Sequence, residues 1–200
     1  MSDPAGKQPV SSSNNRGGPA DQAVAMDRMY RLTRHVYDLT RHYYLLGRDR
    51  MLDKVATSPT TSTLEVGCGT ARNLIKLARR AEPGLLCGLD AKTMFGRDEP
   101  FDTIYFSYCL SMVPTWPGAI EAALANLRPG GVMLIVDFWD QKELPPLFAA
   151  ALKKWLSLFH VHYRPEVHDA LVELGKSGRA EVTFESVARR YAYIATVRKN

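Results

Sequence analysis

Apolar residues recur in two different patterns along the chain, one with a helical period and one made of short continuous runs. Between residues 21 and 56 a single apolar stripe repeats every three or four positions, at Met29, Leu32, Val36, Leu39, Tyr43 and Leu46. This period predicts an amphipathic helical region, which Gly47 is expected to divide into two helices. From residue 63 onward, short apolar runs alternate with helical patterns as far as the C-terminus.

The alternation that begins at residue 63 predicts an α/β sheet. Strands are expected at residues 63–66, 85–90, 101–108 and 132–138, and a closing hairpin of two more at 180–184 and 191–197. Helices are expected at residues 71–81, 118–127, 147–160 and 165–175. The helix over 147–160 has a broad apolar face opposite Lys153 and Lys154, which suits either packing on the core or contact with a membrane.

A glycine turn, Gly67-Cys68-Gly69, joins the first of these strands to the helix after it. Two glycines at this spacing let the backbone turn sharply and approach a ligand closely, because neither carries a Cβ atom. The helix after the turn would direct its free N–H groups and the positive end of its dipole at such a ligand. This arrangement is typical of nucleotide-type cofactor sites, and Asp90, about twenty residues further on, is placed to accept hydrogen bonds from ribose hydroxyls.

Two motifs resemble those of a known family. The run Glu65-Val66-Gly67-Cys68-Gly69-Thr70 resembles the glycine motif of class I S-adenosylmethionine-dependent methyltransferases. A second motif of that family is similar to Leu127-Arg128-Pro129-Gly130-Gly131, which stands before an apolar strand. The resemblance implies a Rossmann-like α/β sheet with helices on both faces, S-adenosyl-L-methionine as the cofactor and methyl transfer as the reaction.

The spacing after Asp90 departs from the family pattern. Only eleven residues separate Asp90 from Asp102, where the family has a helix and a strand. A complete βαβ unit takes roughly thirty residues or more, so the segment 91–100 is expected to be a loop and the fold to lack about one β/α unit. By the resemblance, the missing unit carries one wall of the adenine pocket. Either the protein binds its cofactor in a reduced pocket, or the chain is a shortened form of an active parent.

Longer segments resemble one branch of this family, the BtaB-type betaine lipid methyltransferases. The similar segments are Met26–Leu32, Tyr37–Arg41, Tyr43–Arg50, Phe106–Trp116, Ile135–Phe138 and Trp155–His162, within a resemblance that extends from Ala25 to Lys199. It implies N-methylation of a lipid headgroup amine, namely trimethylation of diacylglyceryl homoserine to diacylglyceryl-trimethylhomoserine. Methylation of phosphatidylethanolamine is the alternative within the enzyme class. A shortened, inactive protein that only binds a ligand is the alternative outside it.

The resemblance also implies a set of site residues. Ser107, Tyr108 and Asp137 are expected at the reacting centre, where Asp137 would orient the amine or steer its proton away. Cofactor contacts are expected from Tyr37, Tyr44, Arg48, Glu65, Gly67, Cys68, Gly69, Thr70, Asn73, Asp90 and Ser107. Because methylation turns the amine into a fixed cation, aromatic faces are expected to stabilise it, with Tyr37, Tyr44, Tyr108 and Trp139 as candidates.

Composition bears on partners and location. The 200 residues carry a net charge of +5 with a pI near 9.2, which suits acidic partners such as anionic lipid heads but equally a solvated basic surface. Residues 1–20 lack apolar periodicity and are expected to be a disordered tail. The methyltransferase domain would then span 21–200, with residues 21–56 as a helical lid whose arginines meet lipid phosphates. Without a secretory signal or a membrane-length apolar run, we expect a cytoplasmic protein that binds its lipid substrate peripherally, on the inner face of the membrane.

Metal and nucleic-acid chemistry are not indicated. The five histidines and three cysteines show no metal-ligand spacing, so no metal site is expected. No nucleic-acid partner is expected either, because the methylation motif Asn/Asp-Pro-Pro-aromatic does not follow the strand at 101–108.

Overall fold

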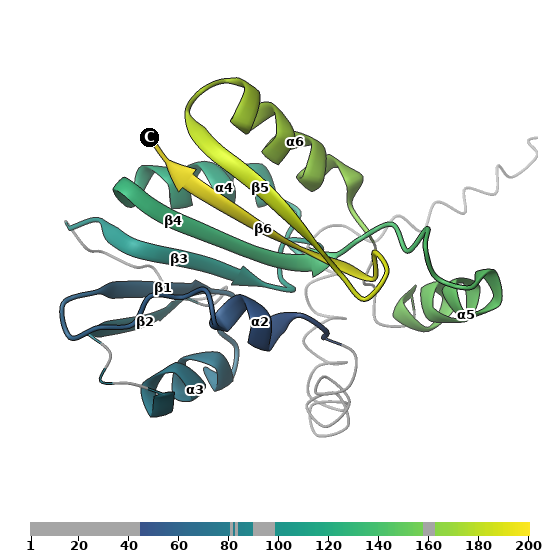
Figure 1. Cartoon of the computed structure of the whole chain (residues 1–200), viewed down its shortest axis with the longest axis horizontal. Helices are drawn as coiled ribbons and strands as arrows, with labels where there is room; N and C mark the ends of the chain where they lie inside the picture. Colours follow the sequence, from purple (N-terminus) through teal and green to yellow (C-terminus); the bar gives the residue numbers. More distant parts are fainter. Residues whose placement is uncertain (1–44, 81, 83, 90–98, 158–162) are drawn as a thin grey trace, which may run out of the picture. The chain divides into compact units, whose positions relative to one another are not determined.

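Six strands form one mixed sheet in the computed structural model of the chain (Figure 1). The structure describes residues 45–80, 82, 84–89, 99–157 and 163–200. The strands are β1 Ser62–Val66, β2 Leu85–Leu89, β3 Phe101–Ser107, β4 Leu127–Phe138, β5 Ala180–Val187 and β6 Ala192–Lys199, in the order β2-β1-β3-β4-β6-β5. The four strands from β2 to β4 are parallel, and β6 runs antiparallel to both of its neighbours. The expected Rossmann-like α/β fold is confirmed.

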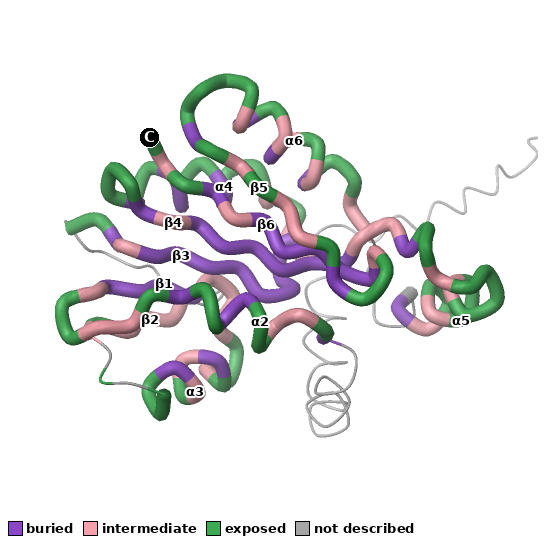
Figure 2. Tube along the Cα trace, in the orientation of Figure 1, coloured by how far each residue is buried: buried purple, intermediate pink, exposed green. Residues whose placement is uncertain are grey.

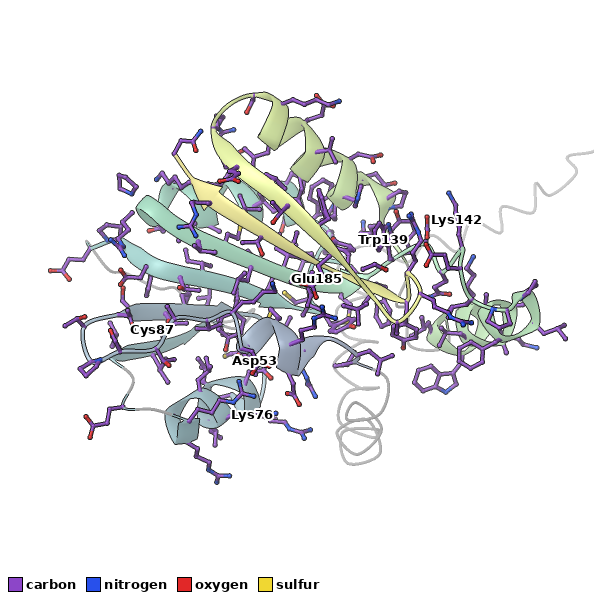
Figure 3. The ribbon with its side chains drawn as sticks, viewed as in Figure 1. Asp53, Lys76, Cys87, Trp139, Lys142 and Glu185 are labelled. Atoms are coloured by element: carbon purple, nitrogen blue, oxygen red, sulfur yellow. The ribbon has the colours of Figure 1, made fainter. Side chains whose placement is uncertain are left out.

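Helices cover both faces of this sheet. They are α2 Arg48–Leu52, α3 Arg72–Arg80, α4 Trp116–Ala125, α5 Pro146–Ser157 and α6 Pro165–Lys176. The chain steps from β1 to β2 in one direction along the sheet and from β3 to β4 in the other, so right-handed crossovers place α3 and α4 on opposite faces. Ion pairs join α2 and the residue after it to α3: Lys76 to Asp49 at 2.5 Å and Arg80 to Asp53 at 2.7 Å. Figure 3 labels one residue of each pair, Lys76 and Asp53.

The main core lies between the sheet and the pair α4 and α6. Burial is concentrated in β3, β4 and β6, which are purple along most of their length in Figure 2. Alternate residues of these strands, such as Ile104, Met133 and Ala195, meet Ile120 of α4 and Leu171 of α6 in one apolar cluster. Side chains alternate between the two faces of a strand, so the residues between these core positions face the other side of the sheet, where α2 and α3 lie. Tyr105 of β3 is on this side, as is Glu65 of β1.

Two expected boundaries were wrong. The segment after α4 was expected to be a turn before a strand at 132, but β4 already begins at Leu127, and the register with β3 shifts between the pairs Phe101–Leu127 and Thr103–Val132. Gly130, with φ +73°, allows the strand to bulge there without ending the pairing. The last strands are also longer than expected, because they pair along eight residues, from Ala180 opposite Lys199 to Val187 opposite Ala192.

The sheet edge next to β1 is formed by β2 within the described part of the chain. The strand that follows along the sequence, β3, lies on the other side of β1. The Ser62 amide and hydroxyl of β1 hold β3 in this place by donating to Asp102 Oδ2 at 2.7 and 2.8 Å. This order agrees with a fold shortened after β2. Residues 1–44 and 90–98 lie outside the described residues, and with them the expected tail, most of the expected lid, Tyr37, Tyr44 and Asp90.

Candidate functional site

The glycine turn connects the carboxyl end of β1 to α3. Gly67 N and Cys68 N both donate to the Leu89 carbonyl, at 2.7 and 3.1 Å, which ties the turn to the end of β2. Gly67 has φ +77°, and a Cβ at this position would lie 2.8 Å from Cys109 Cβ. Only glycine fits here, because the loop after β3 approaches the turn from the other side.

The turn presents backbone groups to solvent at this edge of the sheet. Gly69 and Thr70 are exposed, and a Cβ built on Gly69 would meet nothing within 4 Å. Ala71 N donates to the Cys68 carbonyl at 2.8 Å, and α3 starts at the next residue, so its first free N–H groups follow directly after the turn. A helix start of this kind favours the negatively charged or polar end of a ligand.

A buried hydrogen bond links the strand before the turn to the helix after it. Asn73 Nδ2 donates to Glu65 Oε1 at 2.6 Å, and both side chains are buried. Tyr105 of β3 lies opposite Glu65 in the parallel pairing of β1 with β3. Burial, together with the neighbouring charge of Glu65, raises the pKa of Tyr105 above its ordinary value, so its hydroxyl stays protonated. The carboxylate that precedes the glycine turn is therefore held between α3 and β3.

Ser107 and Tyr108 end β3 at the same edge. The Ser107 hydroxyl is buried and has no hydrogen-bond partner among the described residues. Tyr108 has φ +53°, packs edge-on against Phe138 with ring centroids 4.7 Å apart and donates its hydroxyl to the Leu46 carbonyl. Burial raises the pKa of Tyr108 well above its ordinary value, although the Arg48 charge opposes this. Tyr108 thus links the end of β3 to the segment before α2, while the Ser107 hydroxyl stays unpaired within the described part of the chain.

Asp137, near the end of β4, holds the loop that follows β3. Its Oδ2 accepts the Ser111 amide at 3.0 Å, and its Oδ1 accepts the Phe138 amide at 2.8 Å. Arg164 Nε donates to the Ser111 carbonyl at 2.8 Å, so the same loop residue is fixed from both sides. Burial raises the pKa of Asp137 to about 6, against the lowering effect of these two amides and of the Arg164 charge. Both carboxylate oxygens therefore position backbone in this structure.

The ring of Trp139, a candidate for binding the methylated cation, is already occupied by other side chains. The Arg190 guanidinium lies 4.0 Å from the ring centroid and His168 stacks on the ring at 5.7 Å. Arg190 also binds Asp140 through two hydrogen bonds of 2.8 and 2.6 Å, which lowers the pKa of that carboxyl to about 2. The Trp139 ring therefore stabilises the join between β4 and the β5–β6 turn.

The structure brings most of the described candidates to one edge of the sheet. Gly67, Cys68, Gly69 and Thr70 form the turn, with Glu65 and Asn73 behind it, and Ser107, Tyr108 and Asp137 end the next two strands. Arg48 is the first residue of α2, close enough for its charge to act on Tyr108. The contributions of these residues to binding and catalysis stay predictions.

Sequence reasoning missed three residues that shape this site: Tyr105, Ser111 and Arg164. Strand alternation could have found Tyr105, because it must share a face with Ser107 two residues later. No sequence signal connects Ser111 to Asp137 or Arg164, since these contacts join segments that are distant along the chain.

In the described ranges no group of three or more His, Cys, Asp or Glu side chains is arranged to hold a metal ion. No helix among these residues is long and apolar enough to cross a membrane.

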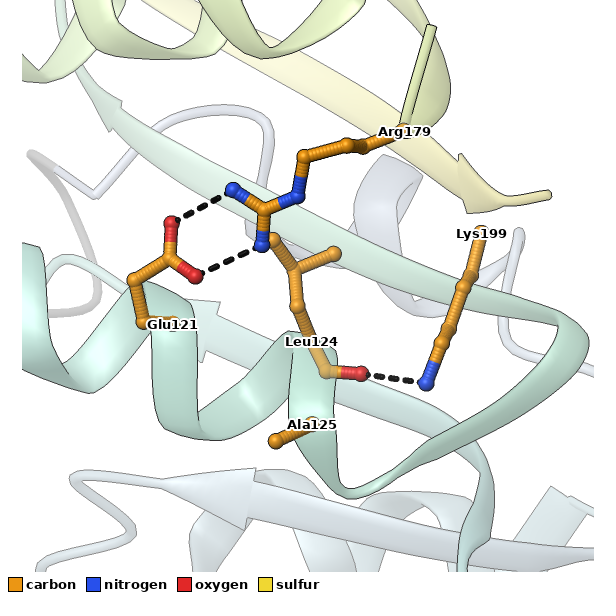
Figure 4. A pocket seen from close by; sticks show the side chains of 5 residues that line it. All are labelled: Glu121, Leu124, Ala125, Arg179 and Lys199. Atoms are coloured by element: carbon orange, nitrogen blue, oxygen red, sulfur yellow. Dashed lines mark hydrogen bonds and ion pairs between the residues drawn. The ribbon is translucent and has the colours of Figure 1, made fainter. Parts of the chain in front are cut away.

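A shallow pocket of about 170 Å³ lies at the opposite, amino-terminal edge of β3 and β4, where Glu121 binds Arg179 and Lys199 binds the Leu124 carbonyl (Figure 4). Its charged groups already have partners, so the glycine turn is the candidate site.

Comparisons with known proteins agree with this fold. A family model described as a methyltransferase domain matches residues 35–172. A search of curated protein sequences found no match.

Solved structures share the fold at low sequence identity. A complex of the plantazolicin methyltransferase BpumL with a triazolic desmethylPZN analogue and S-adenosylhomocysteine is 12% identical, with a TM-score of 0.63 over 90% of this chain and 94% of that one. A possible histamine N-methyltransferase from Thermotoga maritima is 15% identical, with a TM-score of 0.58 over 88% and 99%. An O-methyltransferase family protein from Burkholderia thailandensis is 14% identical, with a TM-score of 0.53 over 90% of this chain and 60% of that one.

Proposed function

Since the chain belongs to the methyltransferase domain family, we propose that it transfers a methyl group to the amine of a lipid headgroup. The protein is an S-adenosylmethionine-dependent methyltransferase, and S-adenosyl-L-methionine is its cofactor. The choice of acceptor is the proposal. The acceptor is diacylglyceryl homoserine, whose amine would be methylated three times to give diacylglyceryl-trimethylhomoserine.

One observation carries the choice of acceptor. Two of the segments that resemble betaine lipid methyltransferases, 106–116 and 135–138, are neighbours in the sheet, with Phe106 opposite Ile135 and Ser107 opposite Val136. Both run to the carboxyl edge, beside the glycine turn. Ligands of open α/β sheets bind at this edge. These two similar segments therefore lie where an acceptor amine would have to lie.

The residues present fit the cofactor. Its chemistry is to supply a methyl group already activated by a positively charged sulfur. In our proposal the Gly67–Gly69 turn and the start of α3 bind the polar end of the cofactor, because this turn offers amides and open space. The buried Ser107 hydroxyl, which has no hydrogen-bond partner among the described residues, is assigned to the cofactor or the acceptor. Tyr37, Tyr44, Arg48 and Asp90 keep their expected roles in cofactor binding.

The remaining task of the protein is to hold a neutral amine in line with the methyl group and to exclude water. Asp137 is assigned to this task through the loop that it fixes, because both of its oxygens accept backbone amides. Tyr108 is assigned to closing the site against water, since it is buried and ties β3 to Leu46. Peripheral binding at the membrane follows from the acceptor proposed.

Transfer of a labelled methyl group tests this function. The protein is incubated with methyl-labelled S-adenosylmethionine and detergent-dispersed diacylglyceryl homoserine or phosphatidylethanolamine, and the extracted lipids are counted. We expect label on the homoserine lipid in mono-, di- and trimethylated products. Label on phosphatidylethanolamine alone would replace the acceptor. Absence of label on both, in a protein that binds the cofactor, would contradict lipid methylation.

A further inference from the structure

Helix α5 exposes two large apolar side chains next to each other. Leu147 is 88% exposed and Phe148 is 56% exposed, more than any other large apolar residue in the described part of the chain. Neither side chain contributes to the main core. Burying a leucine or phenylalanine side chain fully is worth about 1.5–3 kcal/mol, so leaving both in water is unfavourable.

The exposed residues lie on the outer face of the helix. Successive residues of an α-helix are rotated by about 100°, so Leu147 points away from Leu156, nine residues later, which is only 4% exposed. Ala151 and Trp155 follow Leu147 at steps of four and share its side of the helix. The helix therefore buries Leu156 and turns Leu147 and Ala151 outward, with the half-buried Trp155 beside them.

The charges of α5 all have the same sign. Lys153 and Lys154 are exposed, and the sequence of α5 contains no Asp or Glu. Lys154 comes seven residues after Leu147, so it lies on the same outer face and not opposite it as expected, whereas Lys153 lies on the other side of the helix. A long side chain of this kind can lie over apolar material while its ammonium group reaches an anion. An apolar strip with a lysine on the same face matches an anionic bilayer surface, where phosphates lie above acyl chains.

The position of α5 connects this strip to the candidate site. The segment before the helix is anchored at the carboxyl end of β4, where Trp139 N donates to the Tyr191 carbonyl at 3.0 Å and Gln141 N donates to the Arg190 carbonyl at 2.9 Å. Figure 3 shows Trp139 and Lys142 on this segment, and Figure 1 shows α5 beyond the end of β4. The glycine turn lies at the same edge of the sheet.

We propose that the outer face of α5 docks the protein on an anionic phospholipid bilayer. We name this surface the α5 strip, and it consists of Leu147, Phe148, Ala151 and Trp155 with Lys154. The role of the α5 strip in catalysis rests on the proposed function. Docking at this edge would bring the candidate site to a lipid headgroup, which stays in the membrane. The helix would lie in the plane of the interface with the strip among the headgroups.

Vesicle flotation tests the apolar part of the strip. The full chain is mixed with vesicles of equimolar phosphatidylcholine and phosphatidylglycerol, and the bound fraction is measured for wild type and for Leu147→Asp/Phe148→Asp. We expect the double variant to lose binding by about tenfold or more, because two apolar side chains are replaced by charged ones. The matched control is Ile75→Asp/Leu85→Asp, which alters two residues that are 47% and 46% exposed on α3 and β2. It should bind as wild type does.

A second pair of variants tests the charged part. Lys154→Glu should weaken binding to vesicles with phosphatidylglycerol and leave the weaker binding to pure phosphatidylcholine nearly unchanged. Arg79→Glu, which makes the same charge change at an exposed position on α3, should have a much smaller effect on both. Added salt should reduce the difference between the two vesicle types.

Three results would overturn the proposal. Equal flotation of wild type and the Leu147→Asp/Phe148→Asp variant would show that another surface binds the membrane. Equal loss in the Ile75→Asp/Leu85→Asp control would show a non-specific effect. A wild-type dimer on size-exclusion chromatography, dissociated by the α5 substitutions and unable to float, would assign the strip to a second copy of the chain.

Different results would contradict the docking surface and the proposed function. Flotation that depends on α5, without methyl transfer to any lipid amine, would leave the docking surface standing and contradict the proposed function. Methyl transfer to detergent-dispersed lipid, with no vesicle binding, would do the reverse.

Discussion

Asn73 donates a 2.6 Å hydrogen bond to Glu65 across the glycine turn, and both side chains are buried. Glu65 belongs to the strand before the turn and Asn73 to the helix after it. The contact therefore fixes the distance between the two ends of the turn. A cofactor loop that keeps its shape before binding loses less entropy when the ligand arrives.

Asn73→Ala should reduce both stability and cofactor affinity. Hydrogen bonds to charged groups contribute about 1.5–3 kcal/mol, and the substitution also leaves a buried carboxylate with fewer partners. Denaturant unfolding and calorimetric titration with S-adenosylhomocysteine measure the two effects. Asn126→Ala is the matched control, since Asn126 is exposed and donates to the Ala122 carbonyl at 2.8 Å, far from the turn. If both variants bound the ligand equally well, the support by Asn73 would be refuted.

Gly67→Ala should damage the site through the backbone. The residue has φ +77°, and the added Cβ would lie 2.8 Å from Cys109 Cβ, so we expect a loss of about 1–3 kcal/mol or more in stability and no measurable cofactor binding. Gly118→Ala in α4 serves for comparison, because its Cβ would meet nothing within 4 Å. That substitution should stabilise by about 0.4–1 kcal/mol in thermal or denaturant unfolding. Normal binding by Gly67→Ala would place the cofactor elsewhere.

Ser107→Ala should separate binding from folding. Its hydroxyl has no hydrogen-bond partner among the described residues, so its removal should leave the free energy of unfolding unchanged or slightly higher. If the hydroxyl meets the cofactor or acceptor, kcat/KM should fall by about threefold to tenfold, as expected for one neutral hydrogen bond. Ser177→Ala should show the opposite pattern, because its hydroxyl donates to the Leu174 carbonyl at 2.7 Å away from the site. An unchanged kcat/KM in Ser107→Ala would remove this residue from the site.

Asp137 should make stability depend on pH in a defined window. Burial raises its pKa to about 6 in the folded protein, above the ordinary 3.8, so the folded state holds the proton more tightly than the unfolded state does. The stabilisation is complete below about pH 4 and is lost as pH rises through about 6, a change of about 3 kcal/mol. Other carboxyls, such as Asp140 with its lowered pKa, act in the opposite direction.

Comparison of variants isolates the contribution of Asp137. Unfolding free energies are measured between pH 4.5 and 7 for wild type, Asp137→Asn and the exposed control Asp169→Asn. We expect the amide at 137 to remove this part of the pH dependence, in addition to a general loss of stability from one mismatched backbone amide. A difference between wild type and Asp137→Asn that stays constant with pH would contradict the raised pKa.

Much of the fold could be predicted from the sequence. The strand at 63–66, the helix after Ala71 and the strand at 85–90 follow from patterns within a few residues, and the structure has all three, with boundaries that differ by at most one residue. The start of β4 could not be predicted in this way. Leu127–Gly131 has the sequence of a turn, and only pairing with β3, across the sheet, keeps it extended.

The candidate site could be predicted in part. The turn and Glu65 were found because their chemistry depends on spacing along the chain. The partners of Asp137 were not, because the contact with Ser111 spans 26 residues. The same limit explains Trp139, whose aromatic ring suggested cation binding but is covered by Arg190 and His168, which come from later elements.

The central claim is that the Gly67–Gly69 turn binds S-adenosyl-L-methionine although the sheet is shortened beside it. Calorimetric titration of the full chain with S-adenosyl-L-methionine and S-adenosylhomocysteine tests this claim most directly. We predict one site per chain, with a dissociation constant between about 1 μM and 1 mM, the range in which enzymes commonly bind their substrates, and loss of that site in Gly67→Ala. Absence of binding by the folded wild-type protein at millimolar ligand would contradict the account.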